Sequence, residues 1–546
     1  MEKNLREVLD KAVKRLGVHD AMIEIEIPRE ERFGDFATPV AMGLSKVLGR
    51  PPRKVAEEIV SFIDERGQFD RIEIAGPGFI NFTYSKEFLF ARMTRLLAEK
   101  GKYVRSDVGK GRRIQVEFVS ANPTGPLHLG HGRGAAVGAA LSNLLEAGGY
   151  SVEREYYVND AGRQVKLLGL SVFAKYQQLL GLEYPFPEDG YRGSYIEDIA
   201  KLMIDRHGSK YSETGFSEAE EFFTDFSYRE MLKEIEADLT EFGIVFDTWQ
   251  SERELYGKND VEKAIDDLRH RRHLYEKDGA LWFKAADFGD DKDRVIVKSD
   301  GEFTYFASDI AYHRKKIEKG FSEIIDIWGA DHHGYISRLK AVIQALGYPP
   351  EHLRVLLVQM VTLLRGGKPV PMSKRAGEFV TLREVVEEVG SDTTKFIFLT
   401  RRPDSHLEFD LEVAKEQSAE NPVFYVQYAN ARINSIFAHA GERGMEAADV
   451  TGADLSLLAV PEELRLIKKL LTYPMTFEGA VVSHEPHRIT FYLQELTGLF
   501  HPYYNKHRVV TDDRELSRAR LALCQGISIV LNDGLAILGL SAPEKM

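Results

Sequence analysis

The chain has 546 residues, of which 43% are hydrophobic and 29% are charged, a composition typical of a multidomain globular protein and not of a fibrous or disordered one. Its formal net charge of -13 argues weakly against a protein that coats nucleic acid non-specifically, although a local basic patch would still allow a specific RNA partner. The single cysteine, Cys524, excludes intrachain disulfides and cysteine-based zinc sites.

The first hundred residues predict a compact α+β module. Apolar residues between positions 5 and 16 have helical spacing, and Gly17 is a plausible helix end. AMIEIEIPRE (21–30) alternates apolar and acidic residues, as a half-buried strand does, and RIEIAGPGFINFTYS (71–85) predicts two strands around a Pro-Gly turn. We expect this module to span residues 1–106, ending in a linker rich in Gly, Lys and Arg.

A parallel α/β pattern follows. Residues 114–119 predict a buried strand, 121–130 a loop, 131–147 a helix rich in small residues and 152–158 the next strand. Such a βαβ unit implies a parallel sheet with a right-handed crossover.

The same pattern returns later in the chain. Residues 323–328 predict a strand, GADHHGY a loop, the stretch to Leu346 a helix and 352–364 another strand. Because open parallel sheets bind ligands beyond the carboxyl ends of their strands, both histidine-bearing loops are placed where a ligand would bind. The charged residues 180–300 are expected to be irregular insertions on the sheet.

From Ser418 onward the apolar spacing is consistently helical. We therefore expect a multidomain α/β protein with a parallel-sheet core over residues 107–415 and an all-α domain over 416–546. The N-terminus resembles neither a signal nor a transit peptide, and no apolar run reaches the roughly 20 residues needed to span a bilayer. The expected location is the cytoplasm, without a membrane partner.

PLHLGH (126–131) places His128 and His131 at the turn between a strand and a helix. Surface exposure or ordinary packing is the commonest fate of such a pair, and a metal site would favour histidines at i and i+4 with a further carboxylate. Here the surrounding glycines allow close approach of a ligand, and the N–H groups of a helix start attract phosphate. The context favours a nucleoside triphosphate, and no metal site is expected.

A second candidate for phosphate binding is KPVPMSKRAGEFVTL (368–382), which carries Lys374 beside Ser373. A Ser-Lys pair in a loop is usually solvated surface. Combined with the histidine turn, it becomes a candidate clamp on a leaving pyrophosphate.

Together these segments resemble a class I aminoacyl-tRNA synthetase: PLHLGH is similar to the HIGH motif and PMSKR to the KMSKS motif. The wider resemblance, over essentially the whole chain, is to the arginyl-tRNA synthetase family. It is carried by VEFVSANPTGPLHLGHGRGA, YYVNDAGRQ, TYFASDIAYH, GADHHGY, NPVFYVQYANARI and the terminal APEKM.

The resemblance implies an N-terminal module that contacts the tRNA elbow, a Rossmann-type catalytic core and a helical anticodon-binding domain. It implies that ATP, as a substrate accompanied by Mg²⁺, activates L-arginine, which is then transferred to the 2′-hydroxyl of the terminal adenosine of tRNA(Arg). Members typically need bound tRNA before they activate arginine, and a monomer is the expected state.

The resemblance also implies roles for individual residues. The catalytic ones would be His128, His131 and Lys374. ATP would be bound by Pro126, His128, Gly130, His131, Gly132, Gly329, Asp331, His332, Met372, Ser373 and Lys374. Arginine would be bound by Glu117, Ser120, Asn122, His131, Tyr305, Asp309 and His333.

One position departs from the family pattern. Pro371 stands at the first lysine of the KMSKS motif, so this positive charge is missing. Lys368 or Arg375 could replace it.

The chemistry of arginine agrees with these assignments. A guanidinium requires carboxylates with matching fork geometry rather than a metal or an apolar hole. Glu117 lies in the apolar strand VEFV, where an unpaired charge would be costly to bury, and a cationic ligand would supply its partner. A solvated acid on an exposed strand face is the alternative. Tyr305 and Asp309 share a face if their segment is helical.

HPYYNKHRVV (501–510) interleaves aromatic and basic residues, which can stack on splayed bases and contact phosphates. Core packing explains the tyrosines equally well. The candidate tRNA-binding residues are Tyr428, Arg432, Tyr504, Lys506 and Arg508.

Three other functions are weighed. Asp331, His332 and His333 resemble the signature of the DHH metal-dependent phosphoesterases, but the further aspartate motifs of that class are not found. A catalytically inactive tRNA-binding relative is disfavoured by the retained His128, His131 and Lys374. A synthetase for another amino acid is disfavoured by the two candidate acids at the side-chain site.

Overall fold

The computed structural model describes residues 1–370, 380–418, 420–445, 450 and 452–546. The candidate residues Pro371, Met372, Ser373, Lys374 and Arg375 lie outside this range. The chain forms two compact units, one from residues 1–106, 424–536 and 541–546, the other from residues 107–423 and 537–540.

The N-terminal module is built on a three-stranded antiparallel sheet with the order β1-β3-β2. Its elements are α1 (Glu2–Arg15), β1 (Phe36–Thr38), α2 (Val40–Leu48), α3 (Pro52–Ser61), β2 (Phe69–Ala75), β3 (Phe79–Tyr84), α4 (Lys86–Glu99) and α5 (Gly101–Val104). The first helix and the two strands of 71–85 are confirmed. The strand expected over 21–30 is wrong: Glu26 forms a single bridge to Ala37, because β1 is only three residues long and offers no partner for a longer strand.

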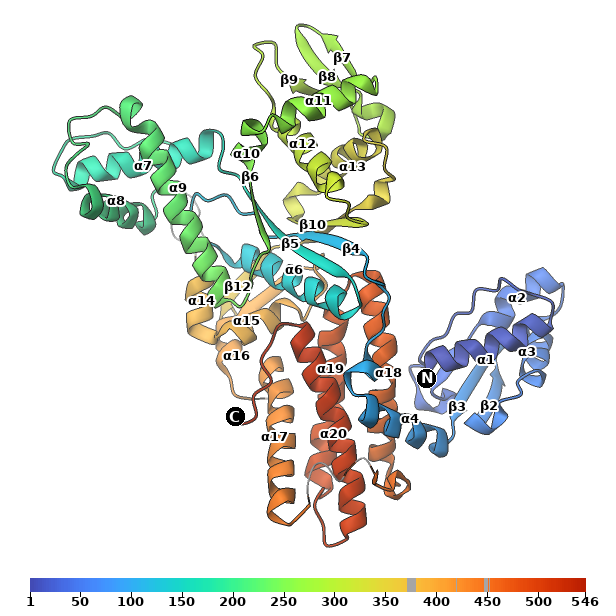
Figure 1. Ribbon diagram of the computed structural model, residues 1–546. Helices are drawn as coiled ribbons and strands as arrows, with labels where there is room; N and C mark the ends of the chain where they lie inside the picture. The colour runs from blue at the N-terminus through green and yellow to red at the C-terminus, as the bar shows by residue number, and fades with distance from the viewer. Residues whose placement is uncertain (371–379, 419, 446–449, 451) are drawn as a thin grey trace. The chain divides into compact units, whose positions relative to one another are not determined.

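The second unit contains the parallel sheet that the sequence predicts. Its strand order is β11-β10-β4-β5-β6, and every neighbouring pair is parallel. The strands are β4 (Arg113–Glu117), β5 (Ser151–Val158), β6 (Thr248–Ser251), β10 (Glu323–Gly329) and β11 (Leu353–Val358), with α6 (Leu129–Ala147) crossing from β4 to β5 (Figure 1). The strand order reverses beside β4, and this reversal is where open α/β sheets form a ligand crevice.

Residues 180–300 are more regular than expected. Helices α8 (Ser194–His207) and α9 (Phe216–Glu241) lie in this stretch and pack with the preceding α7 (Arg163–Leu179) around a core of their own. The stretch also supplies β6, the edge strand of the central sheet, which is only four residues long and therefore leaves no periodic signal.

The region between β6 and β10 forms a second group of elements around α12 (Figure 1). It comprises α10 (Glu252–Gly257), α11 (Asp260–His270), β7 (Leu274–Lys277), β8 (Ala280–Phe283), β9 (Arg294–Val297) and α12 (Tyr305–Glu318), with α13 (Ile336–Ala345) following β10.

The strand expected over 352–364 is in fact two strands in different sheets. After β11 the chain turns at Gln359, whose N–H donates to the carbonyl of Pro403 at 2.8 Å. The elements after this turn are β12 (Val361–Arg365), β13 (Lys368–Pro369), α14 (Leu382–Val389), α15 (Ser391–Phe398), β14 (Leu407–Asp410) and α16 (Leu411–Lys415). Strands β13, β12 and β14 form a small sheet of their own.

The C-terminal region is helical, as predicted, and its long helices run alongside one another in Figure 1. They are α17 (Pro422–Glu442), α18 (Pro461–Ser483), α19 (His487–Lys506) and α20 (Arg514–Ile537). Within the described residues α20 alone is long and apolar enough to cross a membrane, and 72% of its most apolar window is buried inside the protein. It is therefore a core helix of this bundle.

Helix α6 approaches β4 so closely that one of its positions must be glycine. A Cβ at Gly138 would lie 2.2 Å from Cγ of Phe118, a fully buried side chain, whereas a Cβ at Gly134 in the same helix meets nothing within 4 Å. We expect Gly138→Ala to lower the free energy of unfolding by about 1–3 kcal/mol through overpacking. Gly134→Ala should instead raise it by up to about 1 kcal/mol, because alanine favours the helix. Urea unfolding measures both, and equal shifts would contradict the close contact.

Candidate active site

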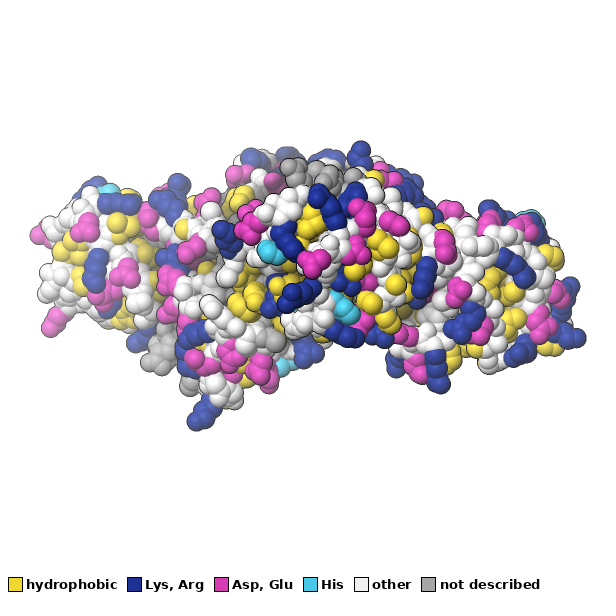
Figure 2. Space-filling view, turned by 90° about the horizontal axis from the view of Figure 1, so that it is seen from below, with side chains coloured by type: hydrophobic (Ala, Val, Ile, Leu, Met, Phe, Trp, Pro, Cys, Tyr) yellow, Lys and Arg dark blue, Asp and Glu magenta, His cyan; other side chains and the backbone are white. Residues whose placement is uncertain are grey.

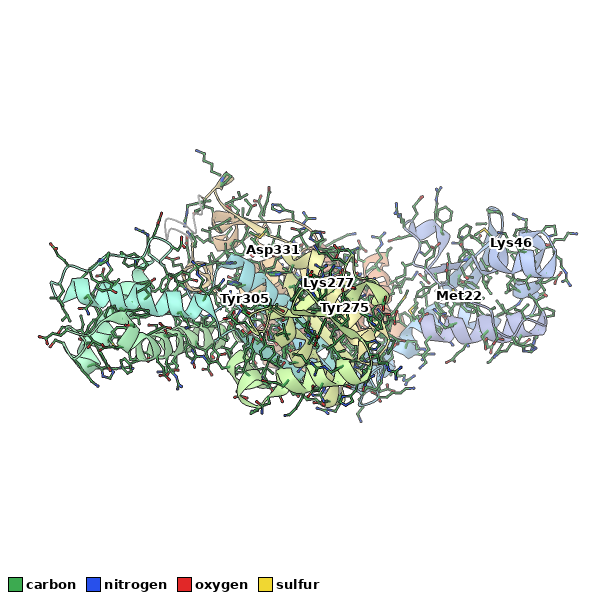
Figure 3. The ribbon with its side chains drawn as sticks, turned by 90° about the horizontal axis from the view of Figure 1, so that it is seen from above. Met22, Lys46, Tyr275, Lys277, Tyr305 and Asp331 are labelled. Carbon is green, nitrogen blue, oxygen red and sulfur yellow. The ribbon has the colours of Figure 1, made fainter. Side chains whose placement is uncertain are left out.

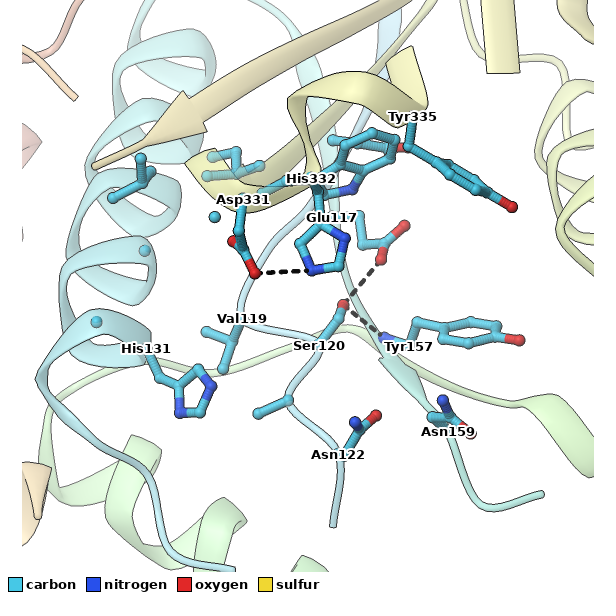
Figure 4. Close-up of a pocket in the computed structure, with 18 of the residues that line it drawn as sticks. Glu117, Val119, Ser120, Asn122, His131, Tyr157, Asn159, Asp331, His332 and Tyr335 are labelled. Carbon is cyan, nitrogen blue, oxygen red and sulfur yellow. Dashed lines mark hydrogen bonds and ion pairs between the residues drawn. The ribbon is translucent and has the colours of Figure 1, made fainter. Parts of the chain in front are cut away.

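A cavity of about 790 Å³ opens at the carboxyl ends of β4, β5, β10 and β11 (Figure 4). Many of the residues proposed for ATP and arginine line it: Glu117, Ser120, Asn122, His128, Gly130, His131, Asp309, Gly329, Asp331 and His332. Segments far apart in the sequence therefore meet around one space.

Other proposed residues lie outside this lining. Pro126 lines a neighbouring pocket. Gly132 is buried at a position where a Cβ would contact the side chain of Leu382. Tyr305 starts α12 with its side chain 65% exposed (Figure 3), and His333 is exposed in the short 3-10 helix Ala330–Tyr335.

The histidine turn is fixed by its own backbone. His128 caps α6, and its Nδ1 accepts the N–H of Gly130 at 3.1 Å, while Nδ1 of His131 accepts the N–H of His128 at 3.3 Å. The two rings stack with centroids 3.7 Å apart. Because each Nδ1 accepts a hydrogen bond, each neutral ring carries its proton on Nε2. In this form both Nε2 atoms are N–H donors, as phosphate binding requires, rather than lone pairs for a metal, and Nε2 of His128 is itself buried.

The segment after 371–379 returns to this turn. The N–H of Leu382 donates to the carbonyl of Leu127 at 2.8 Å, and Thr381 forms an antiparallel bridge with His128. Thr381 also caps α14, where its hydroxyl accepts the N–H of Glu384 at 3.1 Å. The end of the stretch 368–382 is thereby held against the start of α6.

Strand β4 ends two residues earlier than expected because the backbone turns sharply. Val119 and Ser120 have φ values of 68° and 40°, a region that a β-branched residue rarely adopts. The turn brings Oγ of Ser120 to donate to Oε1 of Glu117 at 2.8 Å and to accept the N–H of Tyr157 at 3.1 Å (Figure 4).

Glu117 has a buried partner, so the expectation of an unpaired charge is wrong. Its Oε2 forms an ion pair with Nζ of Lys316, a side chain that is 1% exposed, and accepts the hydroxyl of Tyr312 at 2.9 Å. Lys316 also binds Oδ1 of Asp326 at 2.8 Å. The buried charge of Glu117 is therefore compensated within the protein and does not require a bound ligand.

This network sets the charge of its members. Burial favours the neutral form of Asp326, but Lys316 and His313 outweigh it and hold the pKa of this acid at about 2. Burial likewise opposes the charge of Lys316, but Asp326 and Glu117 raise its pKa above the ordinary value. The cation thus stays charged between two strands that each contribute a buried acid.

Asp309 supplies a second carboxylate from α12. It is half-buried and accepts the hydroxyl of Tyr335. Burial raises its pKa, against the effect of that hydrogen bond. A cationic ligand would favour its ionised form.

Comparison with known proteins decides the family. Residues 92–437 match the model of the class I (R) tRNA synthetase catalytic domain, residues 2–84 the arginyl tRNA synthetase N terminal domain and residues 426–546 the DALR anticodon binding domain. The chain is 48% identical over 554 residues to the arginine–tRNA ligase of Syntrophotalea carbinolica, covering 100% of both chains. It is 51% identical over 526 residues to that of Citrifermentans bemidjiense, covering 96% of this chain and 95% of the other.

The chain belongs to the arginyl-tRNA synthetase family. Its activity is that of an arginine–tRNA ligase, with a class I aminoacyl-tRNA synthetase catalytic domain. The fold of this synthetase agrees: the arginyl-tRNA synthetase of Thermus thermophilus superposes with a TM-score of 0.79 at 23% identity, over 100% of both chains.

The phosphoesterase alternative is not favoured. In this synthetase Asp331 and His332 belong to a short 3-10 helix after β10. Among the described residues no three His, Cys, Asp or Glu side chains are grouped to hold a metal ion, as a two-metal site would require.

Sequence reasoning missed much of the pocket wall of the synthetase. The missed lining residues include Tyr157, Asn159, Tyr312, Trp328, Tyr335, Gln359 and Met360. One signal pointed to the buried Lys316: two acids, Glu117 and Asp326, stand in apolar strands and need a cation. The aromatic residues carry no such signal, because aromatic side chains in strands and helices usually form ordinary core.

Four of the five candidate tRNA-binding residues of the synthetase lie on α17 and α19, and Arg508 follows the end of α19. The guanidinium of Arg432 lies 4.6 Å from the ring centre of Tyr428 and 4.4 Å from that of Tyr504. Lys506 is exposed and pairs with Glu462. Tyr503 is fully buried, so the neighbouring tyrosines of HPYY divide between core and surface.

Proposed function

We propose that this pocket converts L-arginine and ATP into arginyl-adenylate and pyrophosphate, and then transfers arginine to the 3′-terminal adenosine of tRNA(Arg). One observation carries the proposal. The same cavity is lined by the imidazole turn at the start of α6 and by the carboxylates of Glu117 and Asp309. A polyanion site and a cation site thus share one space.

The ATP side rests on the helix start. The N–H donors of His128 and His131 and the backbone around Gly130 suit phosphate oxygens. Gly329, Asp331 and His332, at the end of β10, line the same cavity and are proposed to contact the nucleotide. Lys374, Met372 and Ser373 complete the proposed set from outside the described residues.

Magnesium is proposed to enter with ATP. Mg²⁺ in such sites keeps several waters and is held mainly by phosphate oxygens, with one or two carboxylates at most. Asp331 offers one exposed carboxylate at the cavity, which fits this mode of binding.

The arginine side is proposed to use Glu117 and Asp309 for the guanidinium and Asn122 for the α-amino group. Asn122 is exposed at the cavity, and its Nδ2 donates to Oε1 of Gln164 at 2.7 Å. Ser120 orients Glu117 through the hydrogen bond already described.

The chemical step asks little covalent help from the protein. An arginine carboxylate oxygen forms a bond to the α-phosphorus while the bond from that phosphorus to the β-bridging oxygen breaks, so that pyrophosphate leaves in line. The residues contribute by positioning both reactants and by stabilising charge on the triphosphate.

ATP–pyrophosphate exchange with arginine, followed by charging of tRNA(Arg), tests the function. We expect exchange with arginine and little with lysine, and a strong increase on adding tRNA. Exchange without charging would indicate a relative that has lost transfer. Absence of both, in a folded protein that still binds tRNA, would contradict the proposal.

tRNA is proposed to bind the α17–α19 surface. Basic and acidic side chains are interspersed on the face of the molecule that Figure 2 shows. Arg432, held between Tyr428 and Tyr504, is a preformed cation and stacking platform of the kind that RNA bases use.

We expect Arg432→Ala to weaken tRNA binding roughly tenfold and to lower the dependence of log Kd on log salt by about one unit, because a phosphate contact and a stacking partner are both lost. Arg508→Ala should act in the same direction. Filter binding measures tRNA affinity, and ATP affinity is the internal control. Equal losses for tRNA and ATP would mean misfolding and contradict the assignment.

We also propose the domain limits 1–106, 107–415 and 416–546, a monomeric state and a cytoplasmic location. The three family-model matches, 2–84, 92–437 and 426–546, support this division. The buried thiol of Cys524, whose pKa burial raises to about 12, suits a reducing compartment in which it has no role.

A further inference from the structure

Glu252, the first residue of α10, is a buried acid that none of the proposed roles uses. It is 3% exposed. Oε1 accepts the hydroxyl of Ser308 at 3.1 Å. With the Asn159 amide turned so that its nitrogen faces acceptors, Nδ2 donates to Oε2 at 2.8 Å. Both carboxylate oxygens are therefore bound by elements that border the cavity.

These partners belong to the arginine end of the pocket. Ser308 is the neighbour of Asp309 in the first turn of α12, and Asn159 follows β5 and lines the cavity (Figure 4). Glu252 thus ties the end of β5 to the start of α12. The side chain of Asp160 fixes the same turn, since its Oδ2 accepts the hydroxyl of Ser251 at 2.7 Å and its Oδ1 accepts the N–H of Arg253 at 3.0 Å.

The charged groups around Glu252 are acidic. Asp309 faces it from α12 and Asp160 from the segment after β5, and the hydroxyls of Tyr157 and Tyr256 complete the surroundings. Arg253, the next residue in the chain, binds the carbonyl of Asp160 and the carboxylate of Asp225 instead. Within the described ranges Glu252 has no basic side chain as an ion-pair partner.

We propose that Glu252 is a positioning residue for the guanidinium end of arginine: it holds Asn159 and the first turn of α12 in place, and it becomes fully ionised when the cationic substrate occupies the pocket. This inference rests on the proposed function of the pocket. It assigns Glu252 a role through its neighbours, without contact to the substrate.

The proposal has a consequence for pH. Burial, reinforced by Asp309 and Asp160 against the hydrogen bond from Ser308, raises the pKa of Glu252 to about 7. A bound cation favours the ionised form, so arginine binding releases a proton when it occurs below or near that pKa. Affinity should therefore rise with pH, and the KM for arginine should fall by up to about tenfold between about pH 6 and pH 8.

Glu252→Gln separates this role from simple packing, because glutamine keeps the shape and removes the charge. We expect its KM for arginine to rise about tenfold at pH 8, with kcat and the KM for ATP within about twofold, and its pH profile to be flatter than that of the unmodified enzyme. Glu254→Gln is the matched control. Glu254 lies on the same short helix, but its carboxylate is half exposed and pairs with Lys258 at 2.7 Å.

Calorimetry gives a readout that does not depend on turnover. Arginine is titrated at pH 7 into the enzyme with bound tRNA, in two buffers of different ionisation enthalpy. We expect about half a proton released per arginine by the unmodified enzyme and by Glu254→Gln, and clearly less by Glu252→Gln. Equal proton release and equal arginine KM in all three proteins would overturn the proposal. If the unmodified enzyme neither binds nor activates arginine, it is the proposed function that fails.

Discussion

His131→Ala is expected to slow arginine activation by about 10²–10³-fold, the usual cost of removing one preorganised donor to a charge that develops during reaction. The imidazole lines the cavity at the first turn of α6. Its Nδ1 accepts the N–H of His128 at 3.3 Å. The proton of the neutral ring is therefore on Nε2, where it can be donated to a ligand. A methyl group can neither donate to a phosphate oxygen nor follow the triphosphate as pyrophosphate departs.

ATP–pyrophosphate exchange at saturating arginine and tRNA measures this effect. His270→Ala is the control, because His270 is an exposed histidine at the end of α11. Urea unfolding should show that His131→Ala remains folded, with a loss of about 1 kcal/mol at most for the missing acceptor at the helix cap. A near-normal exchange rate would remove His131 from the mechanism.

Lys316→Met should have the largest effect on stability, lowering the free energy of unfolding by about 3–5 kcal/mol, because it leaves two buried acids without their shared cation. Glu117 and Asp326 are 6% and 0% exposed, so water cannot replace the ammonium group. The loss should be greatest at neutral pH and should shrink as the pH falls and the two acids become protonated.

In the unmodified protein, by contrast, acidification lowers the free energy of unfolding that Asp326 contributes. The folded-state pKa of Asp326, about 2, lies below the ordinary value, so its contribution to stability is complete above about pH 4 and is lost as the pH falls towards 2. Urea unfolding at pH 7 and pH 5 distinguishes the two proteins.

Lys315→Met is the matched control for this substitution. Lys315 is the preceding residue of α12, and its ammonium binds the neutral amide of Gln250 at 2.7 Å, so its loss should cost about 1 kcal/mol. Adding Asp326→Asn to Lys316→Met should recover part of the stability, since one of the stranded charges is removed. A loss no larger than that of Lys315→Met would show that the buried cation is dispensable.

The sequence predicts the parts of this fold whose patterns are local. The strand, glycine-rich turn and helix over 114–147 stand together in the chain, so the position of His128 and His131 at a strand-to-helix turn beside the cavity can be predicted without knowing the rest. Strand β6 could not, because four residues carry no period, and AMIEIEIPRE shows the converse: a strand pattern is not sufficient where no strand of matching length lies beside it.

The acidic end of the pocket, at Glu117 and Asp309, is less accessible to sequence reasoning. Asp309 was found through the family motif, but the pairing of Glu117 with Lys316 joins β4 to α12 across a long sequence separation. The sequence indicates that a buried acid needs a cation, and only the topology selects which one. Glu252 was hidden for the same reason, since its two partners come from the end of β5 and the start of α12.

The division of the chain into two units has a consequence for biosynthesis. The unit containing residues 1–106 also includes residues 424–536 and 541–546, whereas the other is nearly continuous from 107 to 423. Because domains generally fold as units during translation, the middle of the polypeptide can fold first on the ribosome. The earliest-made segment can complete its own unit only after the last helices have emerged from the exit tunnel.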